Sequence, residues 1–150
     1  MTNLLTRTLI TNAGLEALIL RIPIGLILAA HGSQKLFGWF GGYGLEGTGK
    51  FMDALGLHPG FLMAVLAGSA ELFGGIGMML GLFTRLSAGS CALTLLVALF
   101  AAHWGRGFFL TTHGIEYALA LLSATTALSI MGGGSYSFDR YLVRLISRSV

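Results

Sequence analysis

The chain has 150 residues, of which 55% are hydrophobic and 10% carry a formal charge. About a quarter of the residues in soluble domains are charged, so this composition excludes an ordinary water-soluble domain. The formal net charge of +3 comes from basic residues near the ends of apolar segments, and it gives no support to nucleic-acid binding.

Four apolar segments make up most of the chain, at about residues 13–37, 60–82, 87–104 and 114–131. Crossing a hydrocarbon core of about 30 Å takes a helix of about 20 residues. The alternative is a soluble helical bundle, but each of its helices would carry a polar face, which these segments lack. The sequence therefore predicts one all-α, polytopic membrane domain over residues 1–150, a bundle of four transmembrane helices.

The first 12 residues are expected to lie at the inner membrane surface and to lead into the first span. Arg7, followed by an apolar run that contains Ala29 and Ala30, could also be interpreted as a secretory signal. The run is too long for a signal peptide and contains Arg21, which favours an uncleaved span.

The first span carries three ionisable side chains on one side. Arg21, His31 and Lys35 fall within an arc of roughly 80° if the segment is helical, because each residue turns about 100°. The other helices must therefore supply partners for one polar stripe.

The loop over residues 38–59 is rich in glycine and aromatic residues, which suits a membrane interface. Residues 50–57 are expected to form a short amphipathic helix in this outer loop. The stretch from Gly44 to Lys50 matches a phosphate-binding loop up to its lysine, but Phe51 replaces the Ser or Thr that binds magnesium. No preceding strand is expected either, so nucleotide binding is disfavoured.

The second span has one face of small residues around a single acid, Glu71. Small residues let membrane helices approach closely, and packing alone would explain them. Glu71 is different, because it lies roughly 15 Å into the span, where an unpaired carboxylate is costly and usually marks function. The residues of this face are Ala64, Ala67, Gly68, Glu71, Gly74, Gly75 and Met78.

The second half of the chain adds polar residues at the outer side. Cys91 is the only cysteine, which excludes an internal disulfide and a thiol relay built on a cysteine pair. His103 ends the third span, His113 lies in the next loop and Glu116 begins the fourth span. Residues 137–150 are expected to form a basic amphipathic tail on the inner surface.

Basic residues near the ends of the spans predict the orientation. Those on one side are Arg7, Arg85, Arg140, Arg144 and Arg148, and those on the other are Lys50 and Arg106, with Lys35 at the membrane edge. We therefore expect a multi-pass protein of the bacterial inner membrane with both termini in the cytoplasm.

The ionisable groups are predicted to meet in a polar pocket in the outer half of the bundle. Helical side chains lean toward the helix N-terminus, so His31 and Glu71 lean toward each other. The preferred pair for Glu71 is therefore His31, with Arg21 second, and Lys35 lies level with Glu116. Each could instead be structural: Arg21 and Lys35 could snorkel to the interface, and His103 and His113 could be interfacial. The pocket set is Arg21, His31, Lys35, Glu71, His103, His113 and Glu116, with no metal site expected.

Several spaced motifs follow one another along the chain. They are Arg21-x3-Gly25-x5-His31-Gly32-x2-Lys35-Leu36-Phe37-Gly38, Glu71-x2-Gly74-Gly75, Leu80-Gly81-Leu82-x-Thr84-Arg85, Gly107-Phe108-Phe109 and Gly114-Ile115-Glu116-Tyr117. Over roughly residues 15–135 the chain resembles the DoxX family of small bacterial membrane proteins. The resemblance implies a four-helix inner-membrane protein. Some members are subunits of a thiosulfate:quinone oxidoreductase and others are linked to quinone or thiol stress. The shared polar positions are Arg21, His31, Lys35, Glu71, Arg85 and Glu116.

Three functions remain open at this point. In the first, the chain is a redox subunit whose outer pocket accepts a quinone head group, with His31 and Glu71 as the candidate catalytic residues. In the second, it is a non-enzymatic scaffold for a soluble oxidoreductase, or it forms a homo-oligomer, with the glycine faces as interfaces. In the third, His31 and His103 are axial ligands of a haem. The bilayer is a partner in all three.

Overall fold

The computed structural model describes Leu9, Thr11 and residues 13–148. The rest of the predicted N-terminal lead, with Arg7, lies outside these residues. The described chain is helical and contains no strand within those bounds. Its long helices are α2 (Leu15–Phe37), α4 (Gly60–Leu80), α5 (Thr84–Ala98) and α6 (Glu116–Met131). A π-helical segment, η2 (Leu99–His103), prolongs α5.

Three of these helices are long and apolar enough to cross a membrane: Leu15–Phe37, Gly60–Leu80 and Thr84–His103. The fourth, α6, is apolar but shorter, at 16 residues. The predicted all-α membrane bundle is therefore confirmed. Its third span begins at Thr84 and not at residue 87, because the turn after α4 is shorter than the sequence suggested.

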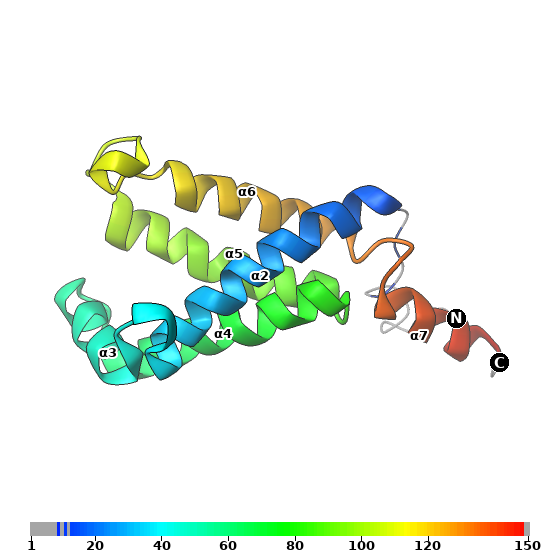
Figure 1. Cartoon of the computed structure of the whole chain (residues 1–150), viewed down its shortest axis with the longest axis horizontal. Coiled ribbons are helices and arrows are strands. Elements are labelled where there is room, and N and C mark those ends of the chain that lie inside the picture. The colour runs from blue at the N-terminus through cyan, green and yellow to red at the C-terminus, as the bar shows by residue number, and fades with distance from the viewer. Residues whose placement is uncertain (1–8, 10, 12, 149–150) are drawn as a thin grey trace.

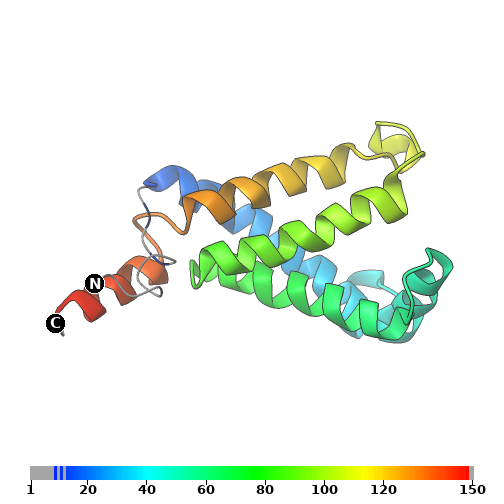
Figure 2. The same ribbon diagram turned by 180° about the vertical axis from the view of Figure 1, so that it is seen from behind.

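The four long helices run along the long axis of the molecule and pack in sequence (Figures 1 and 2). Helix α2 packs on α4, α4 on α5, and α5 on α6, while α2 also touches α6. We call one end of the bundle the α3 end, because it holds α3 (Gly44–Ala54) and the loop before α6. The opposite end, with α7 (Phe138–Arg148) and the turn between α4 and α5, is the α7 end.

The predicted short helix in the first loop is present, but its position differs. Helix α3 covers Gly44–Ala54 after a 3-10 turn, η1 (Trp39–Gly41), instead of residues 50–57. The stretch that resembled a phosphate-binding loop is therefore helical. Its backbone N–H groups beyond the first turn are used within the helix, so they cannot cradle a phosphate.

Helices α2 and α4 touch backbone to backbone through glycine. A Cβ on Gly32 would lie 2.4 Å from the backbone nitrogen of Leu72, and one on Gly75 would lie 2.5 Å from the carbonyl oxygen of Gly25. On the other side of α4, a Cβ on Gly74 would lie 2.5 Å from Sγ of Cys91 in α5. The predicted small-residue face is buried at every predicted position except Ala67, and it is used for packing within this chain.

Large apolar side chains cover the outside of the bundle. Ile19, Phe73 and Leu93 are each more than 60% exposed, although they lie within long apolar helices. In water such a surface would be unfavourable. A lipid bilayer supplies the apolar surroundings that it needs, so these side chains face lipid.

The α2–α4 contact leads to a first prediction. Gly32→Ala should lower the free energy of unfolding by about 1–3 kcal/mol, because the added methyl group forces two backbones apart. Gly89→Ala is the matched control, since a Cβ there meets nothing within 4 Å. Thermal unfolding in one detergent compares them. Equal melting temperatures for the two variants would contradict this packing.

Asp53 fixes the start of α4 and generates a second prediction. Its Oδ1 accepts the backbone N–H of Gly60 at 2.7 Å and lies 2.8 Å from Nδ1 of His58. The Gly60 hydrogen bond and then the His58 hydrogen bond lower the pKa of Asp53 below its ordinary value. A lowered folded-state pKa means that the contribution to stability is present above the unfolded-state value and disappears as pH falls through the folded-state value.

We therefore expect the protection factors of the amides at the first turn of α4, which correct for the intrinsic exchange rate at each pH, to fall only below pH of about 4, where the unfolded carboxyl begins to titrate. In Asp53→Asn this acid-dependent step should be absent. A step of equal size in both proteins would show that another group is responsible.

Candidate functional site

A single ion pair joins α2 to α4 near the α3 end. Nζ of Lys35 donates to Oε2 of Glu71 at 2.5 Å, and the side chains are 24% and 5% exposed. Lys35 leans toward the start of α2 and Glu71 toward the start of α4. Because these antiparallel helices begin at opposite ends, the two side chains lean toward each other.

Lys35, and not His31, is therefore the hydrogen-bonded partner of Glu71. The prediction of His31 compared only how deep the backbone of each residue lies in the membrane. On that measure Lys35 lies too far toward the outer surface to reach Glu71. The long lysine side chain spans the difference in depth between the two backbones. Gly68 leaves space for this side chain, since a Cβ there would lie 3.3 Å from Cβ of Lys35.

His31 lies one turn before Lys35 and extends the polar group toward α6. Its ring centroid is 6.1 Å from that of Tyr117, with the ring planes tilted by 41°. It also interacts electrostatically with both Lys35 and Glu71. The structure thus brings His31, Lys35, Glu71 and Tyr117 together from three helices. Tyr117 was missed as a site residue, although its place next to Glu116 in a shared motif could have suggested it.

The other predicted residues of the α3 end organise the loop before α6. Oε1 of Glu116 accepts the backbone N–H of Leu110 at 2.5 Å. Nδ1 of His103 lies 2.9 Å from the carbonyl oxygen of His113, and because a carbonyl only accepts, Nδ1 must carry the proton. These contacts close the loop, and Glu116 does not join the Lys35–Glu71 pair.

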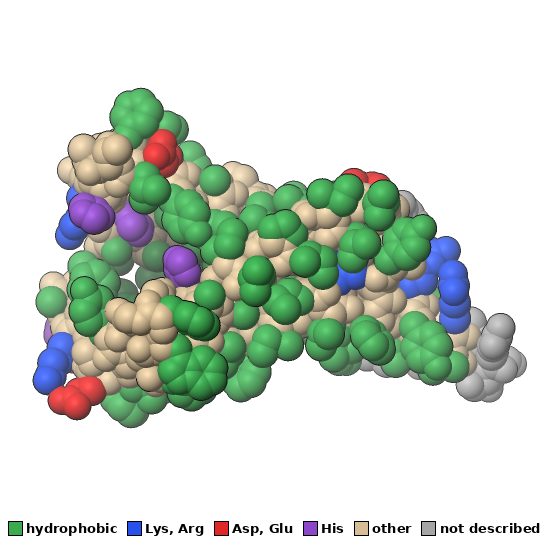
Figure 3. Space-filling view, in the orientation of Figure 1, with side chains coloured by type: hydrophobic (Ala, Val, Ile, Leu, Met, Phe, Trp, Pro, Cys, Tyr) green, Lys and Arg blue, Asp and Glu red, His purple; other side chains and the backbone are tan. Residues whose placement is uncertain are grey.

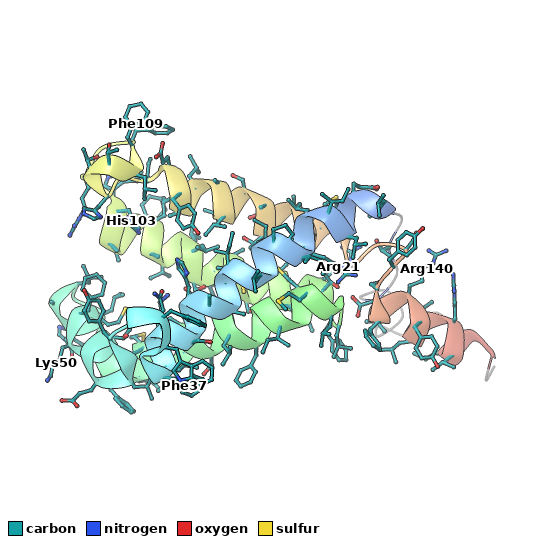
Figure 4. The ribbon with its side chains drawn as sticks, viewed as in Figure 1. Arg21, Phe37, Lys50, His103, Phe109 and Arg140 are labelled. Carbon is teal, nitrogen blue, oxygen red and sulfur yellow. The ribbon has the colours of Figure 1, made fainter. Side chains whose placement is uncertain are left out.

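The surface is hollowed at the α3 end, between α3 and the loop before α6. Figure 3 shows histidine side chains around this hollow, and Figure 4 shows His103 at the same end of the bundle. Within the described residues, no three His, Cys, Asp or Glu side chains are grouped to hold a metal ion. The haem interpretation stays a prediction.

Arg21 lies at the α7 end and does not join the predicted pocket. It is 2% exposed, and its guanidinium donates to the carbonyl oxygens of Met78, at 2.9 Å, and Met79. It also donates to the carbonyl of Tyr136 at 2.6 Å. Arg21 leans toward the start of α2, where the last carbonyls of α4 lack helical partners. It therefore caps α4 and does not reach Glu71.

Two further side chains cap helices at the same end. Arg85 donates to the carbonyls of Ser129, at 3.3 Å, and Ile130, in the last turn of α6. Asp139 accepts the N–H groups of Phe83 and Thr84 at 2.6 and 2.9 Å and so caps α5. The sequence interpretation missed Asp139. One sequence feature could have suggested its role: Asp139 is the one acidic side chain after Glu116, and it lies within an arginine-rich tail.

Glu71→Ala should destabilise the protein more than an exposed ion-pair change does. Breaking a buried pair costs about 3–5 kcal/mol, and we expect less here because Lys35 is partly exposed. Glu71→Gln should be milder, since an amide oxygen still accepts from Lys35. The matched control is Glu46→Ala, whose partner Lys50 lies at 3.0 Å on the surface, where an ion pair contributes little to stability. Equal melting of Glu71→Ala and Glu46→Ala would contradict a buried pair.

Comparison with known proteins gives the family. The family model described as DoxX matches residues 17–104. A Bacillus subtilis (strain 168) protein with the name "Putative oxidoreductase CatD" is 35% identical over 112 residues, which cover 75% of this chain and 77% of the relative. No solved structure matches the chain. The matched region contains α4, most of α2, and the helix formed by α5 and η2, with both members of the Lys35–Glu71 pair. The chain belongs to the DoxX family of membrane proteins.

Proposed function

We propose that this protein is a membrane subunit of a redox system and that the hollow at its α3 end receives the head group of a quinone. The single observation that carries the proposal is the Lys35–Glu71 ion pair with His31 beside it. Ionisable groups at membrane depth usually mark a functional site. The family and the name of the relative support the link to redox chemistry.

The proposed chemistry uses the side chains as proton donors and as a fixed charge pair. Reduction of a quinone to a quinol takes up two electrons and two protons. His31 is the proposed proton donor to a quinone oxygen, because imidazole titrates near physiological pH. Lys35 stabilises negative charge on the reduced head group, and Glu71 holds Lys35 in place. Of the two protons, one comes from His31 and one from water at the hollow, and water also returns a proton to His31.

The electrons come, in this proposal, from a partner oxidoreductase. The sequence carries a single cysteine and no flavin or iron–sulfur motif, so the chain's own contribution is proton delivery and positioning. The glycine faces considered as partner interfaces are occupied by α2 and α5 of this chain. This favours a chemical role over one that depends on those faces for assembly.

His31→Gln tests the proposal, because glutamine keeps hydrogen bonding but cannot deliver a proton. Quinone-dependent turnover in membranes that contain the native partner should fall by about 100-fold or more, the usual contribution of a general acid. His58→Gln is the control, since its side chain is 68% exposed and belongs to the α3–α4 junction. Turnover is measured with a short-chain ubiquinone and normalised to the amount of this protein. Unchanged turnover in His31→Gln would favour the scaffold function.

We also propose that the α7 end faces the cytoplasm. Arg85, Arg140 and Arg144 gather at this end, as the positive-inside rule requires. Cys91 is fully buried, so single cysteines can be introduced at exposed positions with little background. A membrane-impermeant maleimide should label Tyr43→Cys in intact cells and Ser135→Cys only after lysis. The reverse pattern would overturn the orientation.

A further inference from the structure

Helix α7 separates an apolar side from an arginine side. Phe138 and Tyr141 are 54% and 56% exposed, whereas Arg140 and Arg144 project from the other side of the helix. Figure 3 shows blue side chains along one side of the α7 end and green ones along the other. A surface of this kind fits the boundary between lipid head groups and acyl chains.

A cavity of about 290 Å³ lies where α7 meets the end of α4. Hydroxyl groups and arginines line it beside one apolar wall. The cavity lies where the apolar and arginine sides of α7 meet, and it is lined by Leu80, Ser135, Tyr136, Ser137, Phe138, Arg140, Tyr141 and Arg144. Arg140 and Arg144 also line a second cavity, of about 210 Å³, on the side of Leu9 and Thr11.

Within the described residues, no carboxylate side chain forms an ion pair with these arginines. All six acidic side chains lie in the described residues, and the ion pairs formed there involve Lys35, Lys50 and His58. The acid closest in sequence, Asp139, is occupied by backbone N–H groups of the α4–α5 turn. The hydroxyl groups of Ser135 and Ser137 donate to backbone carbonyls, so the donors and the positive charge that the cavity offers to an anion come from the arginines.

The apolar wall of the cavity continues along the lipid-facing side of α4. Leu80 lines the cavity and shares a helix face with Ile76 and Phe73. These side chains are 47%, 39% and 66% exposed. An occupant can therefore place a charged group among the arginines and an apolar chain along α4.

We propose that this cavity binds the phosphate head group of an anionic phospholipid, with an acyl chain along Phe73, Ile76 and Leu80. Clusters of basic residues next to a transmembrane helix bind anionic head groups through the same charge attraction. A soluble phosphate would use the arginines but not the apolar track, and a protein partner would not require a phosphate. The proposal is independent of the quinone function, because it concerns the opposite end of the bundle.

The test is lipid retention by the purified full chain, measured by native mass spectrometry after exposure to equal amounts of phosphatidylglycerol and phosphatidylcholine. The parent should retain phosphatidylglycerol in preference. Arg140→Gln/Arg144→Gln should lower that preference roughly 30-fold, since each arginine near an anionic surface contributes about fivefold. Arg144→Gln alone should lower it about fivefold, which covers the case in which the double variant fails to fold.

Lys50→Gln/Arg106→Gln is the matched control, because it removes the same formal charge at the α3 end. It should keep the preference of the parent. Equal retention of the two lipids by the parent, or a preference that survives in the arginine variants, would overturn the proposal. Retention of inorganic phosphate by the parent in place of either lipid would also overturn it, since it would show a site for the free ion that does not use the apolar track.

Discussion

The ion pair between Lys35 and Glu71 is the interaction on which the α3 end depends. Glu71 is 5% exposed within a helix that is otherwise apolar, and a carboxylate there needs a cation or a proton. The donor comes from α2, so satisfying Glu71 fixes how far α2 is shifted along α4. The glycines at the same interface make this possible, because they let the two backbones approach closely. His31 is then held one turn away, against Tyr117 of α6.

At the α7 end, charged side chains bind the backbone groups at the ends of helices. Helices α4 and α6 end there and α5 begins there, and their last carbonyls and first N–H groups have no partners within the helix. In or near lipid such groups are costly. Arg21 and Arg85 cap the ends of α4 and α6, and Asp139 caps the start of α5. Arg21, Arg85 and Asp139 are therefore bound to backbone groups, whereas Lys35 and Glu71 are bound to each other.

The sequence predicted the four spans, the short helix in the first loop and the buried small-residue face of α4, because length, hydropathy and helical period depend on local sequence. It did not predict the partner of Glu71, since the reach of Lys35 depends on side-chain length and on the room left by Gly68. The capping of α4 by Arg21 could not be predicted either, because the acceptors are backbone carbonyls, and no sequence pattern identifies which carbonyls a side chain will bind. Helix α3 begins at Gly44 in spite of its glycines because tertiary contacts override propensity. For example, a Cβ on Gly49 would lie 3.1 Å from Cα of Phe61.

A charge-swap cycle measures most directly whether the Lys35–Glu71 pair fixes α2 against α4. Lys35→Glu and Glu71→Lys are each expected to lower the melting temperature sharply, because each places two like charges at one buried site. The double variant Lys35→Glu/Glu71→Lys restores opposite charges and should recover much of the loss, with a coupling energy of at least about 1 kcal/mol. Losses that simply add in the double variant would contradict the account, because they would show that the two side chains do not act as a pair.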